Sequence, residues 1–196
     1  MRLLLATHNA GKRAELCALL SNIPGITLVT AHEQPFSSVE ETGETFLENA
    51  LLKARAVSRE TGLAVLAEDA GLEVDALDGA PGVRSARFSG LPVDYARNNA
   101  MLLDRLGGRT DRQARFVAWA VLRLPDGREY TSQGTLPGRI ATAARGEGGF
   151  GYDSLFIPDG DTRTLAQIPL EEKNRTSHRR RAIDGLKGIL SQLAYE

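Results

Sequence analysis

The opening of the chain alternates apolar and amphipathic segments with almost no spacer between them. Residues 2–6 are apolar enough for a buried strand, and residues 10–20 place leucines on one face of a helix. A second short strand is expected at residues 26–30. This close alternation favours an α/β fold.

The remaining pattern adds helices, a strand and a hairpin to this start. A polar loop over residues 31–43 precedes a predicted helix, and two Gly-rich segments read as loops. A long β-hairpin, with Asp126 in its turn, comes late in the chain, so the predicted sheet is mixed. No repeat or linker interrupts residues 1–196, which are expected to form one domain. The further elements expected are a helix at 44–60, a strand at 63–71, a helix at 92–106 and a helix at 177–194 with Ser177 as N-cap.

Charge and cysteine usage exclude several classes of protein. The 24 basic and 25 acidic residues give a net charge of -1, so nucleic acid is not an expected partner. The single Cys17 excludes a disulfide framework and a zinc finger. No apolar run approaches the ~20 residues of a membrane span, and no signal peptide is recognisable, so a cytoplasmic protein without a membrane partner is expected. A small anionic ligand needs only a local cluster of donors.

The turn between the first strand and the first helix carries such donors. A helix start presents backbone N–H groups and the positive end of the helix dipole. Thr7, Asn9 and Lys12 add side-chain donors beside it. An anion site and an ordinary capped turn with a solvated lysine both fit these residues.

The helix predicted at residues 44–60 carries a lysine on its apolar stripe. Phe46, Ala50 and Val57 mark the stripe, and Lys53 falls on it. A lysine facing a core is costly unless its charge is matched, so Lys53 either extends outward along its flexible stem or faces an anion. We favour the anion, because acidic residues and the Thr7–Lys12 turn are expected at the same edge of the sheet.

Two acidic pairs lie at the ends of predicted segments. Glu68 and Asp69 close the strand at 63–71, and Glu40 and Glu41 lie in the loop before the lysine-bearing helix. Adjacent carboxylates repel each other unless a cation or a proton relieves them. Carboxylate oxygens without His or Cys suit Mg²⁺ or Mn²⁺ rather than zinc. Solvated acidic turns are the alternative.

Two features of the second half point to a nucleobase or another acceptor-rich ligand. A glycine loop presents Phe150, Tyr152 and Asp153, and an aromatic ring with an acid can stack on a base and bond its edge. Phe150 could equally be a core residue. Arg179 lies on the inward face of the C-terminal helix, in its first turn, where a positive charge opposes the helix dipole. A bound acceptor would offset that conflict.

Taken together, these motifs resemble the inosine triphosphate pyrophosphatase family. The matching segments occur in order over residues 3–182 and read "ATHNAGK", "EETGETFLENALLKA", "AEDAGLEVDAL", "GAPGVRSARFSG", "GGFGYDSLF" and "EEKNRTSHRRRA". The resemblance implies an elongated mixed β-sheet flanked by helices, two lobes with an active-site cleft between them, and a homodimer. It also implies hydrolysis of deaminated purine nucleoside triphosphates (ITP, dITP, XTP) to the monophosphate and pyrophosphate. Mg²⁺ is the implied cofactor, with Mn²⁺ as a possible substitute.

The resemblance also implies roles for individual residues. Asp69 would be the catalytic base for the attacking water, and it would share the metal with Glu40 or Glu41, between which the sequence does not choose. Phe150 would stack on the purine and Asp153 would hydrogen-bond it. The full set of implied substrate-binding residues is Thr7, His8, Asn9, Ala10, Gly11, Lys12, Lys53, Ala70, Phe150, Gly151, Tyr152, Asp153, Lys173, His178 and Arg179.

The chain departs from the family pattern beside Asp69. The family commonly has "DDSG" where this chain has Glu68, Asp69, Ala70 and Gly71. Ala70 offers only its backbone to a ligand, and the longer Glu68 puts the metal geometry in doubt. Two alternatives remain: a pyrophosphatase of other modified nucleotides on a related fold, and a nucleotide-binding regulator without turnover.

Overall fold

The computed structural model describes residues 1–194, and the chain divides into two compact units. Unit 1 contains Met1–Asp69, Ala118–Gly134 and the segment from His178 onward, and unit 2 contains Ala70–Val117 and Thr135–Ser177. One six-stranded sheet runs in the order β2-β1-β3-β4-β5-β6. β1 pairs in parallel with β2 and β3, and β5 pairs antiparallel with β6. The predicted α/β fold with a mixed sheet is confirmed.

The elements follow the predicted order closely. The strands are β1 (Arg2–Leu5), β2 (Thr27–Val29), β3 (Ala64–Val74), β4 (Gln113–Arg123), β5 (Glu129–Ile140) and β6 (Phe156–Pro158). The α-helices are α1 (Ala10–Leu20), α2 (Phe46–Thr61), α3 (Tyr95–Leu106), α4 (Leu170–Thr176) and α5 (His178–Leu193). Within residues 1–194, no helix is both long and apolar enough to cross a bilayer.

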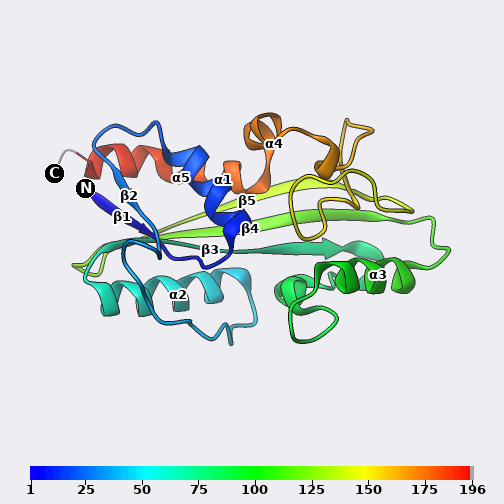
Figure 1. Cartoon of the computed structure of the whole chain (residues 1–196), viewed down its shortest axis with the longest axis horizontal. Coiled ribbons are helices and arrows are strands. Elements are labelled where there is room, and N and C mark those ends of the chain that lie inside the picture. The colour runs from blue at the N-terminus through cyan, green and yellow to red at the C-terminus, as the bar shows by residue number, and fades with distance from the viewer. Residues whose placement is uncertain (195–196) are drawn as a thin grey trace. The chain divides into compact units, whose positions relative to one another are not determined.

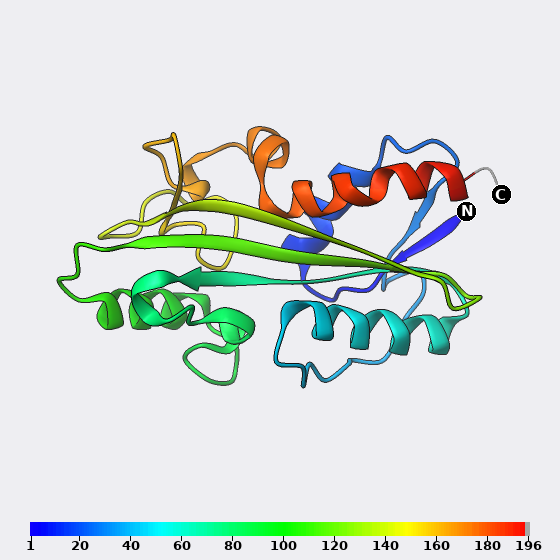
Figure 2. The same cartoon turned by 180° about the vertical axis from the view of Figure 1, so that it is seen from behind.

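Unit 1 packs helices on both faces of its strands. α2 lies on one face, while α1 and α5 lie on the other, as both views show (Figures 1 and 2). Ala50, Ala54 and Val57 of α2 are fully buried and belong to a core cluster with Leu4 of β1 and Val65 of β3. The predicted inward stripe of this helix is therefore confirmed.

β5 and α5 approach each other closely within unit 1. A Cβ on Gly134 of β5 would overlap the carbonyl oxygen of His178 and the amide nitrogen of Ala182. The first turn of α5 thus lies directly on the strand backbone. Only glycine leaves room for this approach.

Unit 2 has a core of its own. Leu72 and Val74 of β3 are buried in one cluster with Leu102 of α3, Phe116 of β4 and Phe156 of β6. The segment predicted as a Gly- and Pro-rich loop contains a 3-10 helix, Gly82–Arg87. In that helix the Ser85 hydroxyl accepts a hydrogen bond of 2.8 Å from the amide of Leu72, so the segment is tied to β3.

The end of β3 differs from the prediction. The strand was expected to end near Gly71 with its two acids at the carboxyl end, but it continues to Val74. Leu72 and Val74 continue the strand because both side chains are buried in the core of unit 2. Glu68 and Asp69 therefore lie inside the strand, with 3% and 5% of their surfaces exposed.

The close approach of β5 and α5 lets us predict how a substitution at Gly134 changes stability. Gly134→Ala is expected to lower the free energy of unfolding by about 1–3 kcal/mol, because the added methyl group overlaps backbone atoms that cannot rotate away. Gly188→Ala, in the same helix α5, is the control, since a Cβ there meets nothing within 4 Å. It should raise stability by about 0.5–1 kcal/mol. Urea denaturation of both variants measures the difference, and equal stability of the two would contradict the packing described.

Candidate functional site

The two buried acids of β3 lie beyond the end of the neighbouring strand. β1 ends at Leu5, which pairs with Leu66 of β3, and the amide of Ala6 still donates to the Leu66 carbonyl at 2.9 Å. Glu68 and Asp69 follow this last pairing, where the turn to α1 leaves the sheet. Ligands of open α/β sheets bind at such strand ends.

The turn into α1 is capped by its own side chains. Asn9 is the N-cap and its Oδ1 accepts from the amide of Lys12 at 3.0 Å, while Thr7 Oγ1 accepts from the amide of Asn9 at 3.2 Å. The first intrahelical bond runs from Arg13 to Asn9. The amides of Ala10 and Gly11 precede it, at the positive end of the helix, which is where anions bind. The capped turn and the anion site are therefore compatible.

Lys12 and Lys53 both approach the acids of β3. Lys12 Nζ lies 3.9 Å from Asp69 Oδ1, and Lys53 Nζ donates to the Glu68 carbonyl at 3.2 Å. Burial lowers the pKa of Lys12, with Glu68 opposing the shift. Burial raises the pKa of Asp69, and Lys12 opposes that shift. The two lysines thus place buried positive charge next to the carboxylates.

The structure distinguishes Glu41 from Glu40. Glu41 forms an ion pair with Lys53, whereas Glu40 is exposed to solvent. The loop that carries them is held by Asn49 of α2, whose Oδ1 accepts from the amide of Gly43 at 2.7 Å. Asn49 Nδ2 donates to Asp69 Oδ2 at 3.2 Å. One buried amide therefore links the Glu41 loop to Asp69.

Arg179 of α5 lies between two buried glutamates. Its Nε donates to Glu68 Oε2 at 2.8 Å, and its Nη1 donates to Glu15 Oε2 of α1. All three side chains are at least 97% buried. Burial opposes ionisation of Glu68, yet Arg179 and Lys12 outweigh it and lower the Glu68 pKa. Sequence reasoning predicted the inward Arg179 but missed Glu15, which reads as an ordinary polar position of α1.

The donor set fits a hard divalent cation held jointly with phosphate. Glu68 Oε1 is buried and has no hydrogen-bond partner, which leaves one carboxylate oxygen to be satisfied. Within residues 1–194, no three His, Cys, Asp or Glu side chains converge tightly enough to form a metal cage of their own. Mg²⁺ is commonly bound by one or two carboxylates together with substrate phosphates. Glu68, adjacent to Asp69, is thus a candidate ligand, although the family resemblance assigned it no role.

Unit 2 holds a second cluster, formed by the glycine loop and α4. Asp153 Oδ2 accepts from Lys173 Nζ at 2.5 Å and from the amide of Phe150 at 3.0 Å. Lys173 Nζ also lies 5.4 Å from the centroid of the Phe150 ring. A Cβ on Gly149, whose φ is +71°, would overlap Asp153 Oδ2. Asp153 was predicted to bond a base, and its Oδ2 organises the loop itself.

Two further side chains hold this loop. Tyr152 is buried and its hydroxyl donates to the Ser85 carbonyl at 2.8 Å. Burial raises the Tyr152 pKa, so the hydroxyl stays protonated. Asn99 of α3 donates to the Gly151 carbonyl at 3.1 Å. Asn99 carries no sequence signal for this role, because a lone Asn on a helix is usually solvated.

The predicted binding residues fall into the two units as follows. His8 is exposed, and its ring lies 4.5 Å from the Phe36 ring. Ala70 is half-buried and directly follows Asp69. Unit 1 contains Thr7, His8, Asn9, Ala10, Gly11, Lys12, Lys53, His178 and Arg179 with the acids Glu40, Glu41 and Asp69, and unit 2 contains Ala70, Phe150, Gly151, Tyr152, Asp153 and Lys173.

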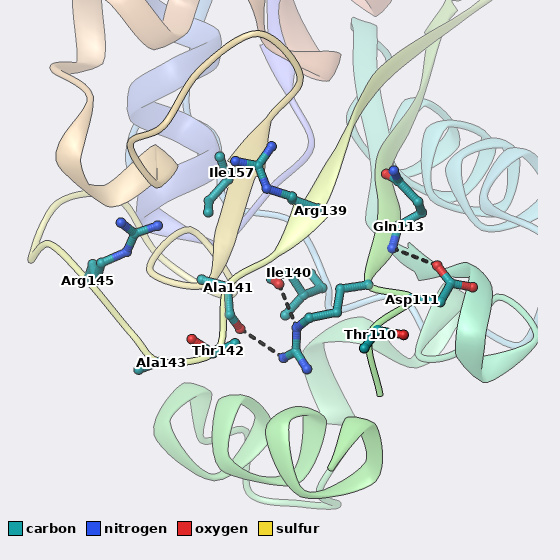
Figure 3. Close-up of a pocket in the computed structure, with 11 residues that line it drawn as sticks. Thr110, Asp111, Gln113, Arg139, Ile140, Ala141, Thr142, Ala143, Arg145 and Ile157 are labelled. Carbon is teal, nitrogen blue, oxygen red and sulfur yellow. Dashed lines mark hydrogen bonds between the residues drawn. The ribbon is translucent and has the colours of Figure 1, made fainter. Parts of the chain in front are cut away.

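A pocket of about 490 Å³ also opens in unit 2, at the ends of β4 and β5. The Arg112 guanidinium in its wall donates to the carbonyls of Ile140 and Ala141, at 2.8 and 2.9 Å. Figure 3 shows Ile140 and Ala141 among the residues that line the pocket. Arg139 and Arg145 also line it. None of the residues predicted to bind substrate is part of its wall.

The fold and the site together define a class of protein. A mixed α/β sheet places two lysines, a helix start and buried carboxylates at the end of β1. This combination of groups is typical of an α/β protein that binds polyphosphate. The Ham1 family model matches residues 3–189. The chain therefore belongs to the Ham1 family, and the resemblance noted in the sequence is confirmed.

Similar proteins cover nearly the whole chain. A protein of Elusimicrobium minutum named dITP/XTP pyrophosphatase is 50% identical, over 94% of this chain and 96% of its own length. A protein of Deinococcus deserti with the same name is 47% identical, over 95% of this chain and 88% of its own length. The solved Ham1 protein of Staphylococcus aureus is 38% identical, with a TM-score of 0.87 over 98% of this chain and all (100%) of that structure.

The burial of Arg179 lets us predict how its replacement changes stability. Arg179→Met should lower the free energy of unfolding by about 3–5 kcal/mol, because Glu15 and Glu68 would remain buried without their cation. Arg181→Met, an exposed position two residues on, is the control and should change it by less than about 0.5 kcal/mol. Chemical denaturation measures both. A wild-type unfolding curve for Arg179→Met would show that the two glutamates do not depend on this cation.

Proposed function

We propose that this protein hydrolyses deaminated purine nucleoside triphosphates, such as ITP, dITP and XTP, to the monophosphate and pyrophosphate. The observation that carries the proposal is the pairing of Lys12 and Lys53 with the carboxylates of Asp69 and Glu41 at the start of α1. A relative named dITP/XTP pyrophosphatase, 50% identical over nearly the full length, supports the same reaction. Such hydrolysis removes non-standard nucleotides before they enter DNA or RNA.

In this proposal unit 1 binds the phosphates and performs the reaction. Lys12, Lys53 and the first amides of α1 stabilise the negative charge that develops on the departing pyrophosphate. Asp69 accepts the proton of the water that attacks the α-phosphorus in line. Burial raises the pKa of Asp69, which makes its carboxylate a better base than an exposed one. Thr7 and Asn9 hold the turn that presents these amides.

Glu41, Glu68 and Asp69 are the residues that would hold Mg²⁺, for which Mn²⁺ could substitute. The cation would neutralise phosphate charge at this position. Glu68 enters the set because its Oε1 is buried without a partner. Glu40 is a weaker candidate because it is exposed.

We assign the purine to the unit 2 cluster. Phe150 stacks on the base and Lys173 donates to it, while Asp153 and Tyr152 hold the loop that carries Phe150 and Gly151. The family resemblance counts His178 and Arg179 among the substrate-binding residues. Their place in unit 1, with Arg179 paired to Glu68, adds a role in orienting that carboxylate. The family resemblance further implies a homodimer, and the cytoplasmic location stays an expectation from the sequence.

The bond that is cleaved can be tested on the wild-type enzyme. With inosine triphosphate and Mg²⁺, the expected products are inosine monophosphate and pyrophosphate in equal amounts, because the lysines hold the two outer phosphates as one leaving group. Ion-exchange chromatography resolves the products. Accumulation of the diphosphate with orthophosphate would contradict the proposal.

The role of Asp69 can be tested by an isosteric change. Asp69→Asn should lower kcat by at least about 10²-fold, because the amide neither accepts a proton nor carries charge to a cation. The fold should persist, since Asn49 can still bond the new side chain. Asp104→Asn, at an exposed position of α3, is the matched control and should keep wild-type kcat. Near wild-type turnover by Asp69→Asn at saturating Mg²⁺ would exclude both roles.

A further inference from the structure

The helix that carries Lys173 is too short to hold itself in place. α4 spans seven residues, Leu170–Thr176, and its N-cap Pro169 makes no side-chain capping bond. Isolated helices shorter than about 12 residues are marginal in water. The position of Lys173 therefore depends on what α4 is attached to.

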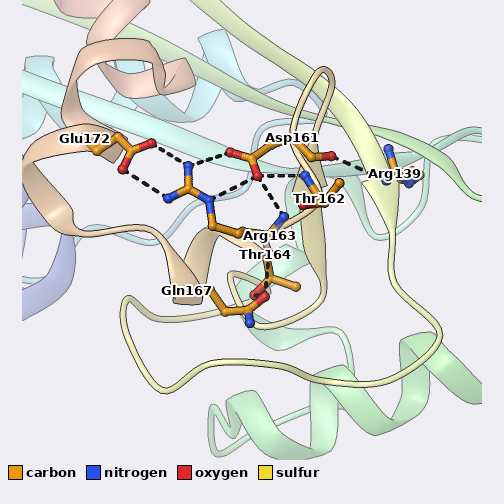
Figure 4. Close-up of polar contacts among 7 residues, drawn as sticks. All are labelled: Arg139, Asp161, Thr162, Arg163, Thr164, Gln167 and Glu172. Atoms are coloured by element: carbon orange, nitrogen blue, oxygen red, sulfur yellow. Dashed lines mark hydrogen bonds and ion pairs between the residues drawn. The ribbon is translucent and has the colours of Figure 1, made fainter.

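α4 has two side-chain attachments at successive residues. Lys173 bonds the buried Asp153, at 2.5 Å. Its neighbour Glu172 bonds Arg163 through both carboxylate oxygens, at 2.5 Å from Nη2 and 3.2 Å from Nη1 (Figure 4). One attachment faces the glycine loop, and the other faces the segment just before α4.

Asp161 fixes the orientation in which the Arg163 guanidinium contacts Glu172. Arg163 Nε and Nη2 donate to the two carboxylate oxygens of Asp161, at 3.1 and 2.8 Å. Asp161 Oδ1 also accepts from the amides of Thr162 and Arg163, at 2.7 and 2.8 Å. Figure 4 shows the guanidinium between the two carboxylates. A planar guanidinium clamped on one edge presents its other edge in a defined direction.

The segment that carries Arg163 is itself fastened to the glycine loop. Thr164 is fully buried, and its hydroxyl donates to the Arg145 carbonyl at 2.6 Å. The amide of Gly148 donates to the Ala166 carbonyl, and the amide of Ala166 donates to the Asp153 carbonyl, both at 3.0 Å. Arg163 and Asp153 thus belong to one bonded framework, and α4 is held against it at two points.

We propose that Arg163 is a positioning residue for base recognition, which sets where α4 presents Lys173 to Asp153 and to the face of Phe150. This inference rests on the proposed function, in which Phe150 and Lys173 bind the purine. Arg163 acts through Glu172 and takes no part in phosphate chemistry. Loosening the clamp therefore weakens substrate binding and leaves the chemical step unchanged.

The expected effect is moderate because the clamp is partly exposed. The Arg163 and Glu172 side chains are 41% and 47% exposed, and exposed ion pairs contribute little individually. Arg163→Met and Glu172→Gln should each raise KM for inosine triphosphate about two- to fivefold, with kcat within about twofold of wild type. The double variant should show no further increase, because both changes break the same attachment.

Two controls separate positioning from general loosening. Arg175→Met lies on the same helix and breaks only the exposed pair with Glu171, at 69% and 84% exposure, so its KM should be unchanged. Inorganic tripolyphosphate, which has no base, should inhibit wild type and the Arg163 variants with the same inhibition constant. Arg163→Lys keeps the charge without the planar fork, so its KM should fall between those of wild type and Arg163→Met. Arg163→Lys replaces Arg163→Met in the test if the methionine variant folds poorly.

The outcomes distinguish the inference from the function on which it rests. No turnover of inosine triphosphate by the wild type overturns the proposed function. With an active wild type, an unchanged KM in Arg163→Met and Arg163→Lys overturns the positioning role. Additive effects in the double variant, the same KM change in Arg175→Met, or weaker tripolyphosphate inhibition overturn it as well.

Discussion

The site in unit 1 depends on the ion pairs that the Arg179 guanidinium forms with two buried glutamates. The guanidinium joins three elements at once, because it lies on α5 and bonds Glu15 of α1 and Glu68 of β3. Three charges this deeply buried are stable only as a set. Removing the cation leaves two buried carboxylates without the guanidinium that bonds them both. The start of α1 and the acids of β3 are thereby held in one arrangement.

This arrangement orients the other charges of the site through contacts within the protein itself. Glu68 stays ionised despite its burial because Arg179 and Lys12 lower its pKa, and Glu68 in turn opposes the fall of the Lys12 pKa. Asn49 adds a fixed link from the Glu41 loop to Asp69. Charges that are already oriented need little reorganisation during a reaction, which is the main advantage of a preorganised site.

Local patterns predicted most of the fold, and contacts distant in sequence explain what they missed. The bounds of α1 and the inward face of α2, with Lys53 on it, follow from apolar periodicity. The extension of β3 to Val74 was missed because it depends on the separate core of unit 2. α4 was missed because seven mostly polar residues have no periodic signal. Glu15 was missed because its partner Arg179 lies 164 residues further on.

That separation sets the order in which a nascent chain can complete its units. Both segments of unit 2, Ala70–Val117 and Thr135–Ser177, are synthesised before α5. Glu15 and Glu68 leave the ribosome early, yet the cation that neutralises them arrives only with Arg179. Unit 1 contains the first residues of the chain, but unit 2 is the first for which every residue has been made. Unit 2 is therefore complete in sequence before unit 1, whose buried glutamates gain their cation only when α5 has been made.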